Sequence, residues 1–382
     1  MTRNGDRPDL LVVGGGVIGL SVARDVARRG LRVTVLDRDE PGRGASWAAA
    51  GMLSPLAEAH ASRPFLEFGL ASLRMYGDWV RELESEVGES VEYRECGKLL
   101  LAFTRSGSAR LDEQERLARR YSVSASRAEP EWLRREDPDL ARSVRGALLV
   151  EEDYRVDNRL LVRALEGGAR RARVEIRAGT AVREIRIQGD RALGVILEDG
   201  SSLDAGTILV AAGAWSGRLE GLSRTVPIRP VRGQMLSLAP EQLPSRRMLE
   251  AEEGYLVPRD DGRLLVGGTM EEVGFRPGNT VRGIRELLES AIHLVPSLES
   301  APIVDFWSGF RPASIDGHPI LGPDPEVRDL FVATGHYRNG ILLAPLTART
   351  MGAVITGETE ASLPPEFLPS RLLAHEGSGG AS

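Results

Sequence analysis

Three glycines near the start of the chain have the spacing of a phosphate-binding turn. Gly14, Gly16 and Gly19 follow an apolar run and open a stretch with helical periodicity. Gly14 allows a tight turn, Gly16 lets a pyrophosphate approach the backbone, and Gly19 permits close packing of the helix on the strand. The phosphates would lie at the positive N-terminus of this helix, beside Val17. Asp37 follows at the distance where an acid binds ribose hydroxyls.

These glycines need a strand before them and a helix after them, and the sequence supplies both. Residues 10–13 form a continuous apolar run, as expected of a buried parallel strand. Ile18, Val22 and Val26 recur at helical spacing, and Gly30 ends the helix. A glycine-rich turn without a ligand is the alternative. Because a second buried strand and the acid complete the βαβ unit, the pattern favours a dinucleotide site.

A run of small residues after the acid bears on which dinucleotide would bind. In residues 42–55, GRGASWAAAGMLSP, small side chains let backbone amides approach a bulky flat ring, and Met52 would lie against that ring. This favours FAD over NAD. The alternative is a small-residue helix that packs on the sheet. The further residues assigned here to the cofactor are Arg38, Ser46, Ala50 and Gly51.

The composition excludes several classes of protein. The chain has 382 residues, enough for two domains, and the hydrophobic content of 42% is typical of globular proteins. The net charge of −6 argues against nucleic acid or an anionic membrane as partner. Cys96 is the only cysteine, which excludes a disulfide framework and a multi-cysteine metal site; no metal is expected. The longest apolar run, 10–23, is shorter than the ~20 residues of a membrane span and lacks a signal peptide's features, so a cytoplasmic protein is expected.

The order of the remaining elements predicts two interleaved domains. Apolar runs typical of buried parallel strands occur at 10–13, 31–37, 207–211 and 330–334, and helices are expected at 65–87, within 110–137 and at 281–294. The fold class is therefore α/β, a Rossmann-like FAD-binding domain with an interleaved α+β substrate domain built on a mainly antiparallel sheet. The expected FAD-binding segments are 1–85, 150–225 and 306–370, the substrate-binding segments are 86–149 and 226–305, and 371–382 is a flexible tail.

Several motifs occur in the order found in a known family. They are the glycine motif, GASWAAAGM (44–52), ILVAAGAWS (208–216), GFRPASIDGHPILG (309–322) and GHYRNGILLAP (335–345). Together they resemble the FAD-dependent amine oxidoreductases, the group of D-amino-acid oxidase, sarcosine oxidase and the glycine oxidase of thiamine biosynthesis. The resemblance is strongest to the glycine oxidase, which usually has Phe where Tyr337 stands here.

The resemblance assigns a role to the turn before the last apolar run. Residues 335–341 would form a second strand–turn–helix, with the amides of Asn339, Gly340 and Ile341 directed at the pyrimidine edge of the flavin. Such donors would favour the reduced, anionic flavin. Without the resemblance, Arg338 and Asn339 would only cap the helix.

Other cofactor contacts are implied by the same resemblance. Val182 would contact the adenine through its backbone, and Gly213 would lie near the phosphates. The sarcosine oxidases attach their flavin to a cysteine in the C-terminal part of the chain. Because the single cysteine here is Cys96, in the expected substrate domain, FAD is expected to bind non-covalently.

The substrate residues are assigned with the family's help as well. Lys98 is the only lysine, so one arginine among many is weak grounds for a function. Arg311, however, lies in an apolar neighbourhood, where its guanidinium would hold a carboxylate by two parallel hydrogen bonds, as in the family. Tyr255 would be a second carboxylate donor, unless it is a core tyrosine, and Arg338 would also reach the substrate. His336 and His318 are both expected to be structural, because the family's chemistry needs no histidine base.

The expected reaction is hydride transfer from the substrate to flavin, which gives an imine. Orientation and stabilisation of reduced flavin would drive it, without a general base. Glycine is the first substrate choice, with sarcosine or small D-amino acids next, oxygen as the electron acceptor, and a homo-oligomer expected from the resemblance alone. A dehydrogenase that uses another acceptor, a nicotinamide-dependent dehydrogenase and a non-catalytic FAD-binding subunit are the alternatives.

Overall fold

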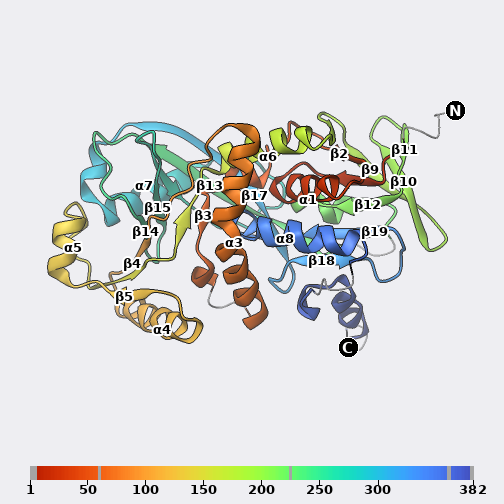
Figure 1. The fold of residues 1–382 in the computed structure, drawn as a ribbon. Helices are drawn as coiled ribbons and strands as arrows, with labels where there is room; N and C mark the ends of the chain where they lie inside the picture. Colours follow the sequence, from red (N-terminus) through yellow and green to blue (C-terminus); the bar gives the residue numbers. More distant parts are fainter. Residues whose placement is uncertain (1–6, 59–61, 223–225, 359–362, 379–382) are drawn as a thin grey trace.

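A six-stranded sheet forms the centre of one half of the molecule (Figure 1). The computed structural model describes residues 7–58, 62–222, 226–358 and 363–378. β1 lies between β12 and β2 and is parallel to both. The strand order is β18 (Ile320–Pro323), β19 (Leu330–Thr334), β12 (Thr207–Val210), β1 (Leu10–Val13), β2 (Val33–Leu36) and β8 (Glu175–Arg177).

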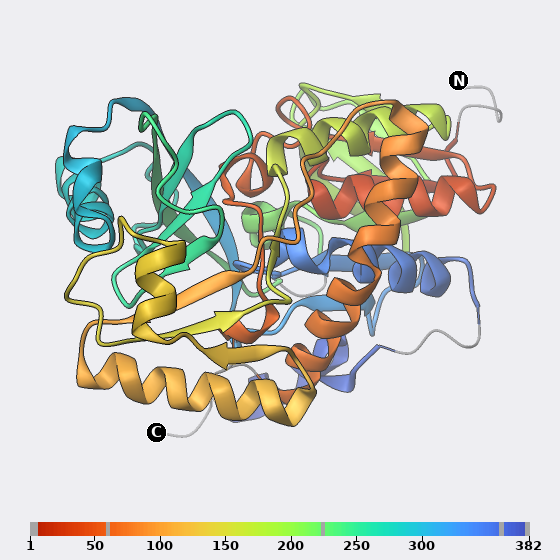
Figure 2. The same cartoon turned by 60° about the vertical axis from the view of Figure 1, so that its left-hand side comes forward.

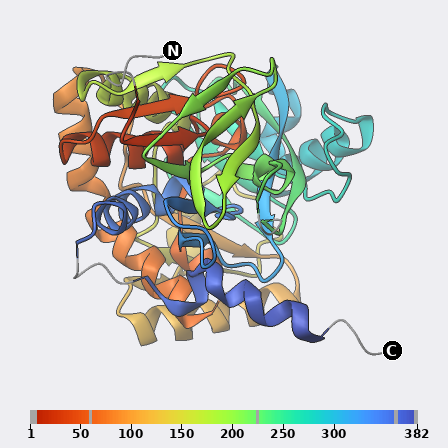
Figure 3. The same ribbon diagram turned by 90° about the vertical axis from the view of Figure 1, so that its right-hand side faces the viewer.

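Two layers cover this sheet, and alternate residues of β1 face them. Leu10 and Val12 belong to the apolar cluster that includes side chains of the four helices on one face. Leu11 and Val13 belong to a second cluster, shared with the three-stranded sheet seen on the other face (Figure 3). Because both faces are covered, the strand is apolar throughout. The helices are α1 (Val17–Arg28), α3 (Arg63–Val87), α6 (Asn158–Arg171) and α8 (Gly340–Ile355), and the small sheet is β9 (Val182–Gln188), β10 (Arg191–Leu197) and β11 (Ser202–Asp204).

An eight-stranded sheet forms the other half of the molecule (Figure 2). All of its pairs are antiparallel except β14 with β4. Leu99 and Leu101 of β4 face the cluster that contains α7 (Val281–Leu294), while Leu100 faces the cluster that contains α4 (Arg105–Tyr121). The order is β17 (Ile303–Ser314), β13 (Ile228–Leu238), β16 (Leu264–Gly267), β15 (Tyr255–Pro258), β14 (Met248–Glu250), β4 (Lys98–Ala102), β6 (Gly146–Val150) and β5 (Ala125–Arg127).

The structure confirms the α/β class, the buried parallel strands and the mainly antiparallel second sheet. The helices expected at 65–87 and 281–294 are α3 and α7, and the charged stretch 110–137 contains the end of α4 and also α5 (Pro130–Glu136). We retain the division into domains as a proposal, although its boundary at residue 306 falls inside β17. No helix of the described residues is long and apolar enough to span a membrane.

The segment expected to be a flexible tail, 371–382, overlaps a 3₁₀ helix at Pro369–Ser378. Residues 379–382 lie outside the described residues. Arg371 donates hydrogen bonds to the carboxylate of Asp316 at 2.7 and 3.1 Å, so the start of the segment is attached to the body of the protein. The flexibility of the rest stays a prediction.

Candidate functional site

Two cavities lie where the carboxyl ends of the parallel strands approach the antiparallel sheet. The first has a volume of about 600 Å³ and runs along the glycine turn, and the second has a volume of about 660 Å³ and lies against the antiparallel sheet. They share wall residues, so they are parts of one site. The shared residues are Ala45, Ala49, Gly309, Phe310, Tyr337, Arg338 and Ile341.

The glycine turn joins β1 to α1 as the sequence predicts. Gly14 has φ of 109°, and a Cβ there would lie 2.5 Å from the carbonyl oxygen of Ala211, which directly follows the neighbouring strand β12. Gly19 packs so closely that a Cβ would overlap the carbonyl oxygen of Gly14. The turn thus requires both glycines, and α1 begins directly at the wall of the first cavity.

The N-terminus of α1 has the geometry of an anion-binding site. The N–H of Val17 donates to Ser46 Oγ at 3.0 Å, although α1 has no side-chain cap of its own. A Cβ at Gly16 would meet only Ser46 Oγ, at 3.3 Å, so the backbone there stays accessible. Because a helix N-terminus carries partial positive charge, this end of the cavity suits a phosphate.

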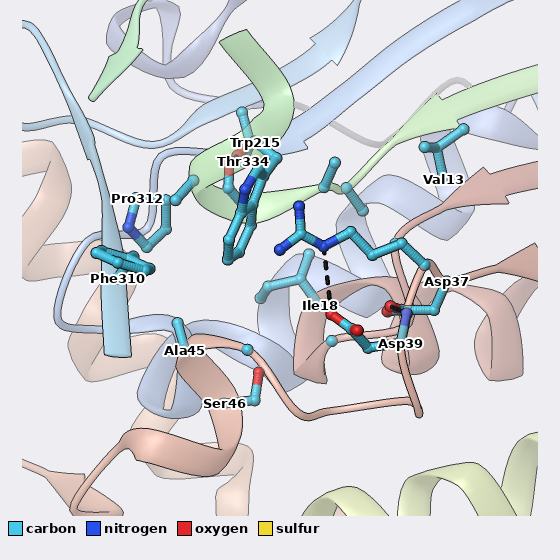
Figure 4. Close-up of a pocket in the computed structure, with 18 of the residues that line it drawn as sticks. Val13, Ile18, Asp37, Asp39, Ala45, Ser46, Trp215, Phe310, Pro312 and Thr334 are labelled. Carbon is cyan, nitrogen blue, oxygen red and sulfur yellow. Dashed lines mark hydrogen bonds and ion pairs between the residues drawn. The ribbon is translucent and has the colours of Figure 1, made fainter. Parts of the chain in front are cut away.

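Asp37 directly follows β2 and lines the same cavity as Trp215 (Figure 4). Its carboxylate accepts hydrogen bonds from the N–H of Gly15 at 2.7 Å and from that of Asp39 at 3.0 Å. Burial raises the pKa of Asp37, which the two backbone donors oppose. Arg38 lies with its guanidinium carbon 3.6 Å from the centre of the Trp215 ring.

A second helix N-terminus faces the place where the cavities meet. α8 begins after Asn339, and the turn before it contains Tyr337, a non-glycine residue with φ of 48°. Such a left-handed residue stores strain that the surroundings must balance. The N–H of Tyr337 donates to Pro312 O at 3.0 Å, and its hydroxyl lies 3.4 Å from Met270 Sδ. Arg338 is exposed and lines both cavities.

His336 lines the first cavity, and its contacts are consistent with the structural role expected for it. The side chain is buried, and its Nε2 lies 3.2 Å from Thr347 Oγ1 on α8. Burial lowers the pKa of His336 to about 3, so the imidazole is neutral at ordinary pH. His318 forms its own contact away from the cavities, with Nε2 2.6 Å from Ser62 Oγ.

This neutral histidine predicts a pH dependence of stability. The imidazole of His336 binds a proton near pH 6.5 in the unfolded chain but only near pH 3 in the folded protein. Its contribution to the free energy of unfolding is therefore fully present above pH 6.5 and is lost as the pH falls from 6.5 toward 3. His336 should contribute a slope of about 1.4 kcal/mol per pH unit in this window. Urea unfolding of wild type and His336→Gln at a series of pH values measures it. An equal slope in both proteins would contradict the assignment.

The second cavity contains the predicted substrate residues. Arg311 on β17 donates from Nη1 to Thr269 O at 2.8 Å, which fixes the guanidinium at the cavity wall. Tyr255 lies beside it, with the hydroxyl 3.3 Å from Met235 Sδ. Burial raises the pKa of Tyr255, so the hydroxyl keeps its proton and can donate. Arg311 and Tyr255 thus offer adjacent donors to one carboxylate.

A glycine within β13 and another directly after β16 make room for these donors. A Cβ at Gly233 on β13 would overlap the guanidinium of Arg311, and a Cβ at Gly268 would lie 3.0 Å from both Arg311 Nη2 and the Tyr255 hydroxyl. Glycine inside a strand often marks such a close approach. Arg311 and Tyr255 therefore pack directly against the backbone of Gly233 and Gly268, which we call the floor of the second cavity.

The change Gly233→Ala should weaken substrate binding. The added methyl must displace the guanidinium of Arg311, and KM should rise about 10- to 100-fold, which is about 1.4–2.7 kcal/mol. The flavin spectrum should stay that of the wild type. Gly146→Ala in β6 is the matched control, because its Cβ would meet only Leu111 at an ordinary 3.7 Å. Equal KM values in the two variants would contradict the role of Gly233.

The structure brings the predicted residues together in two groups that share Arg338 and Ile341. Gly19 lines neither cavity and acts through packing. The first cavity is lined by Gly14, Gly16, Val17, Asp37, Arg38, Ser46, Val182, Gly213, Arg338, Gly340 and Ile341. The second is lined by Ala50, Gly51, Met52, Tyr255, Arg311, Arg338, Asn339 and Ile341.

Sequence reasoning missed other wall residues. Trp215 lines the first cavity, and the motif that contains it offered its indole as a visible signal. Gly233 and Thr269 line the second cavity. A glycine inside an otherwise regular strand was the only local signal for Gly233, and Thr269 had none.

The residues present fit a flavin dinucleotide. The first cavity supplies a helix N-terminus for phosphates and an acid for ribose, and it continues into a second cavity walled by small residues. Cys96 lines neither cavity, and burial raises the pKa of its thiol. The site therefore holds its cofactor without a bond to this cysteine.

Comparisons with known proteins agree with this geometry. The family model DAO, FAD dependent oxidoreductase, matches residues 9–353. The chain is 40% identical over 372 residues to the bifunctional protein ThiO/ThiG of Synechocystis sp., covering 96% of this chain and 54% of that protein. It is 35% identical to the glycine oxidase of Pseudomonas aeruginosa, covering 95% of this chain and 99% of that one. The crystal structure of glycine oxidase from Geobacillus kaustophilus matches with a TM-score of 0.91 and 32% identity, covering 96% and 99%. The chain spans about half the length of the ThiO/ThiG relatives.

Proposed function

The chain belongs to the FAD-dependent oxidoreductase family, and on that basis we propose that this enzyme oxidatively deaminates glycine or another small amino acid. The observation that carries the proposal is the pairing of Arg311 with Tyr255 in a cavity continuous with the one that fits FAD. Two adjacent donors at one wall recognise a carboxylate. The glycine oxidases among the relatives support the same substrate class.

The side chains of this protein bind and orient the substrate. FAD, when bound, supplies the chemistry by accepting a hydride from the substrate carbon. Arg311 and Tyr255 hold the carboxylate, which fixes the direction of the Cα–H bond and gives the rate advantage of a preoriented reaction. His336, which lines the first cavity, is neutral and hydrogen-bonded to Thr347, so no proton transfer is assigned to it.

The side chains around Arg311 and Tyr255 favour a small substrate. Met52 and Met235 line the cavity with the two donors, and the alanines at 45 and 48–50 also line it. Glycine is therefore the first choice, with sarcosine and small D-amino acids next. The products with oxygen as acceptor would be glyoxylate, ammonia and hydrogen peroxide, since water hydrolyses the imine.

We extend the proposal to thiamine thiazole biosynthesis. The names of the ThiO/ThiG relatives support this role. The imine formed from glycine would then be the product that the next enzyme consumes.

Product analysis tests the proposed function. Purified protein should consume oxygen with glycine and form glyoxylate, ammonia and hydrogen peroxide in equal amounts. Sarcosine, D-alanine and D-proline are the alternative substrates, each assayed separately at the same concentration as glycine. Oxidation of one of these with no turnover of glycine would reject glycine as substrate, and no turnover with any of them would reject the proposed activity.

A further inference from the structure

Two buried side chains hold the carbonyl groups of the segment that lines the second cavity. Asn158 Nδ2 donates to the carbonyl oxygens of Ser46 and Trp47 at 2.8 and 3.0 Å. Arg259 Nη2 donates to the carbonyl oxygen of Ala50 at 2.9 Å and to Asn158 Oδ1 at 3.0 Å. We call Arg259 and Asn158 the carbonyl clamp. Both residues are buried, Arg259 to 2% exposure.

The clamp also determines where the amides of this segment point. In a planar trans peptide the C=O and the following N–H point in opposite directions. Because Ala50 O faces Arg259, the N–H of Gly51 points away from the clamp. Gly51 O accepts from the N–H of Val156 at 3.0 Å, so the N–H of Met52 also points away from that side. Among the described residues, none accepts a hydrogen bond from Gly51 N–H.

These amides belong to residues that line the second cavity beside the cofactor space. Gly51 has φ of 71°, and a Cβ there would overlap the carbonyl oxygen of Val156. The segment therefore packs closely against Val156, in addition to its hydrogen bonds with the clamp. An uncompensated amide at a cavity wall requires an acceptor, because a buried donor without a partner is costly.

We propose that Arg259 and Asn158 are positioning residues for the flavin. By holding the carbonyl groups of residues 46–51 on the far side, they present the amides of Gly51 and Met52 to the cofactor as hydrogen-bond donors. Preorganised donors stabilise negative charge that develops on a bound group. The clamp would thus raise both the affinity for FAD and the ease of its reduction, without contact to the substrate.

The charge of Arg259 is balanced by the neighbouring carboxylate of Asp157. Its Nε lies 3.5 Å from Asp157 Oδ2, and its Nη1 lies 3.4 Å from Val156 O. Burial lowers the pKa of Arg259 to about 10, while Asp157 opposes that shift, so the guanidinium is charged at neutral pH. Its planar guanidinium places several donors in a fixed geometry that an ammonium group does not reproduce.

The test compares Arg259→Met, Arg259→Lys and Asn158→Ala with the wild type. The dissociation constant of FAD, measured by titrating apoprotein, should rise about tenfold or more in each. The midpoint potential of bound flavin, measured against a reference dye, should become more negative. Arg259→Lys keeps the charge but not the fork, so it should not restore either quantity. Neither measurement needs an amino-acid substrate. The inference about the clamp can therefore fail while the proposed function stands, and the proposed function can fail while the inference stands.

Arg155→Met is the matched control. Arg155 is also buried and pairs with Asp260 at 2.6 Å, and among the described contacts its side chain donates to no carbonyl of residues 46–51. Thermal unfolding of each apoprotein separates loss of folding from loss of FAD binding. Of the three clamp variants, Asn158→Ala is expected to disturb the fold least. Wild-type affinity and potential in the clamp variants would overturn the proposal. So would equal losses in Arg155→Met, or full rescue by Arg259→Lys.

Discussion

Replacing Arg311 with alanine is expected to lower kcat/KM for the amino-acid substrate about 10³-fold, about 4 kcal/mol. The reason is that the substrate carboxylate would lose the guanidinium that lies against Gly233 and Gly268, and of the two paired donors only Tyr255 would remain. Most of the loss should appear in KM, with the visible spectrum of bound FAD unchanged. Steady-state oxygen consumption and the anaerobic rate of flavin reduction measure the two effects.

Arg338→Ala is the comparison for this prediction. Arg338 is exposed at the junction of the cavities, 3.8 Å from Met270 Sδ through Nη1, so its removal should have the smaller effect. Arg311→Lys should recover part of the loss, because it keeps the charge but not the bidentate geometry. A kcat/KM in Arg311→Ala within about twofold of wild type, well under 1 kcal/mol, would remove Arg311 from the substrate site.

The second large effect is expected from Gly19→Ala, which should give protein that is largely free of flavin. The added methyl overlaps the carbonyl oxygen of Gly14, so α1 must move off β1 and the phosphate-binding turn must open. The same overpacking should lower the free energy of unfolding by about 1–3 kcal/mol. The flavin-to-protein absorbance ratio after purification and denaturant unfolding of the apoprotein measure the two consequences.

Gly167→Ala in α6 is the control for this change. Its Cβ would meet only Val87 at 3.4 Å, an ordinary contact, so flavin content and stability should stay close to those of the wild type. A Gly19→Ala protein that is purified with a full complement of FAD would show that the close packing of α1 on β1 is not needed for cofactor binding.

The first half of the site could be predicted from the sequence because its determinants are local. The strand, turn and helix around Gly14 and Gly19 are contiguous, and each element has its own periodicity. Asp37 follows at the end of the next strand, where it accepts the hydrogen bond from Gly15 N–H. The family resemblance added Arg311 and Tyr255, which the structure places at the same cavity wall.

The floor of the second cavity could not be predicted, because it depends on strand register. Arg311 meets Gly233 only because β13 and β17 pair with Val231 opposite Arg311. Nothing local to either strand specifies this pairing, since register follows from the packing of the whole sheet. The contact with Gly268 adds a third segment of the chain.

The carbonyl clamp was hidden for a different reason. In a chain with one lysine and many arginines, Arg259 has no distinguishing context in the sequence. Its burial and its bonds to Ala50 and Asn158 come from three segments far apart in the chain. Only the fold shows that this arginine differs from the surface arginines.

The central claim is most directly tested by the visible absorption of the purified protein, recorded without air before and after glycine is added. The account predicts a flavin spectrum that glycine bleaches and that oxygen restores. It also predicts that Arg311→Ala needs far more glycine for the same bleaching. A flavin spectrum that persists with glycine, sarcosine, D-alanine and D-proline alike would contradict the account and would favour a non-catalytic FAD-binding protein.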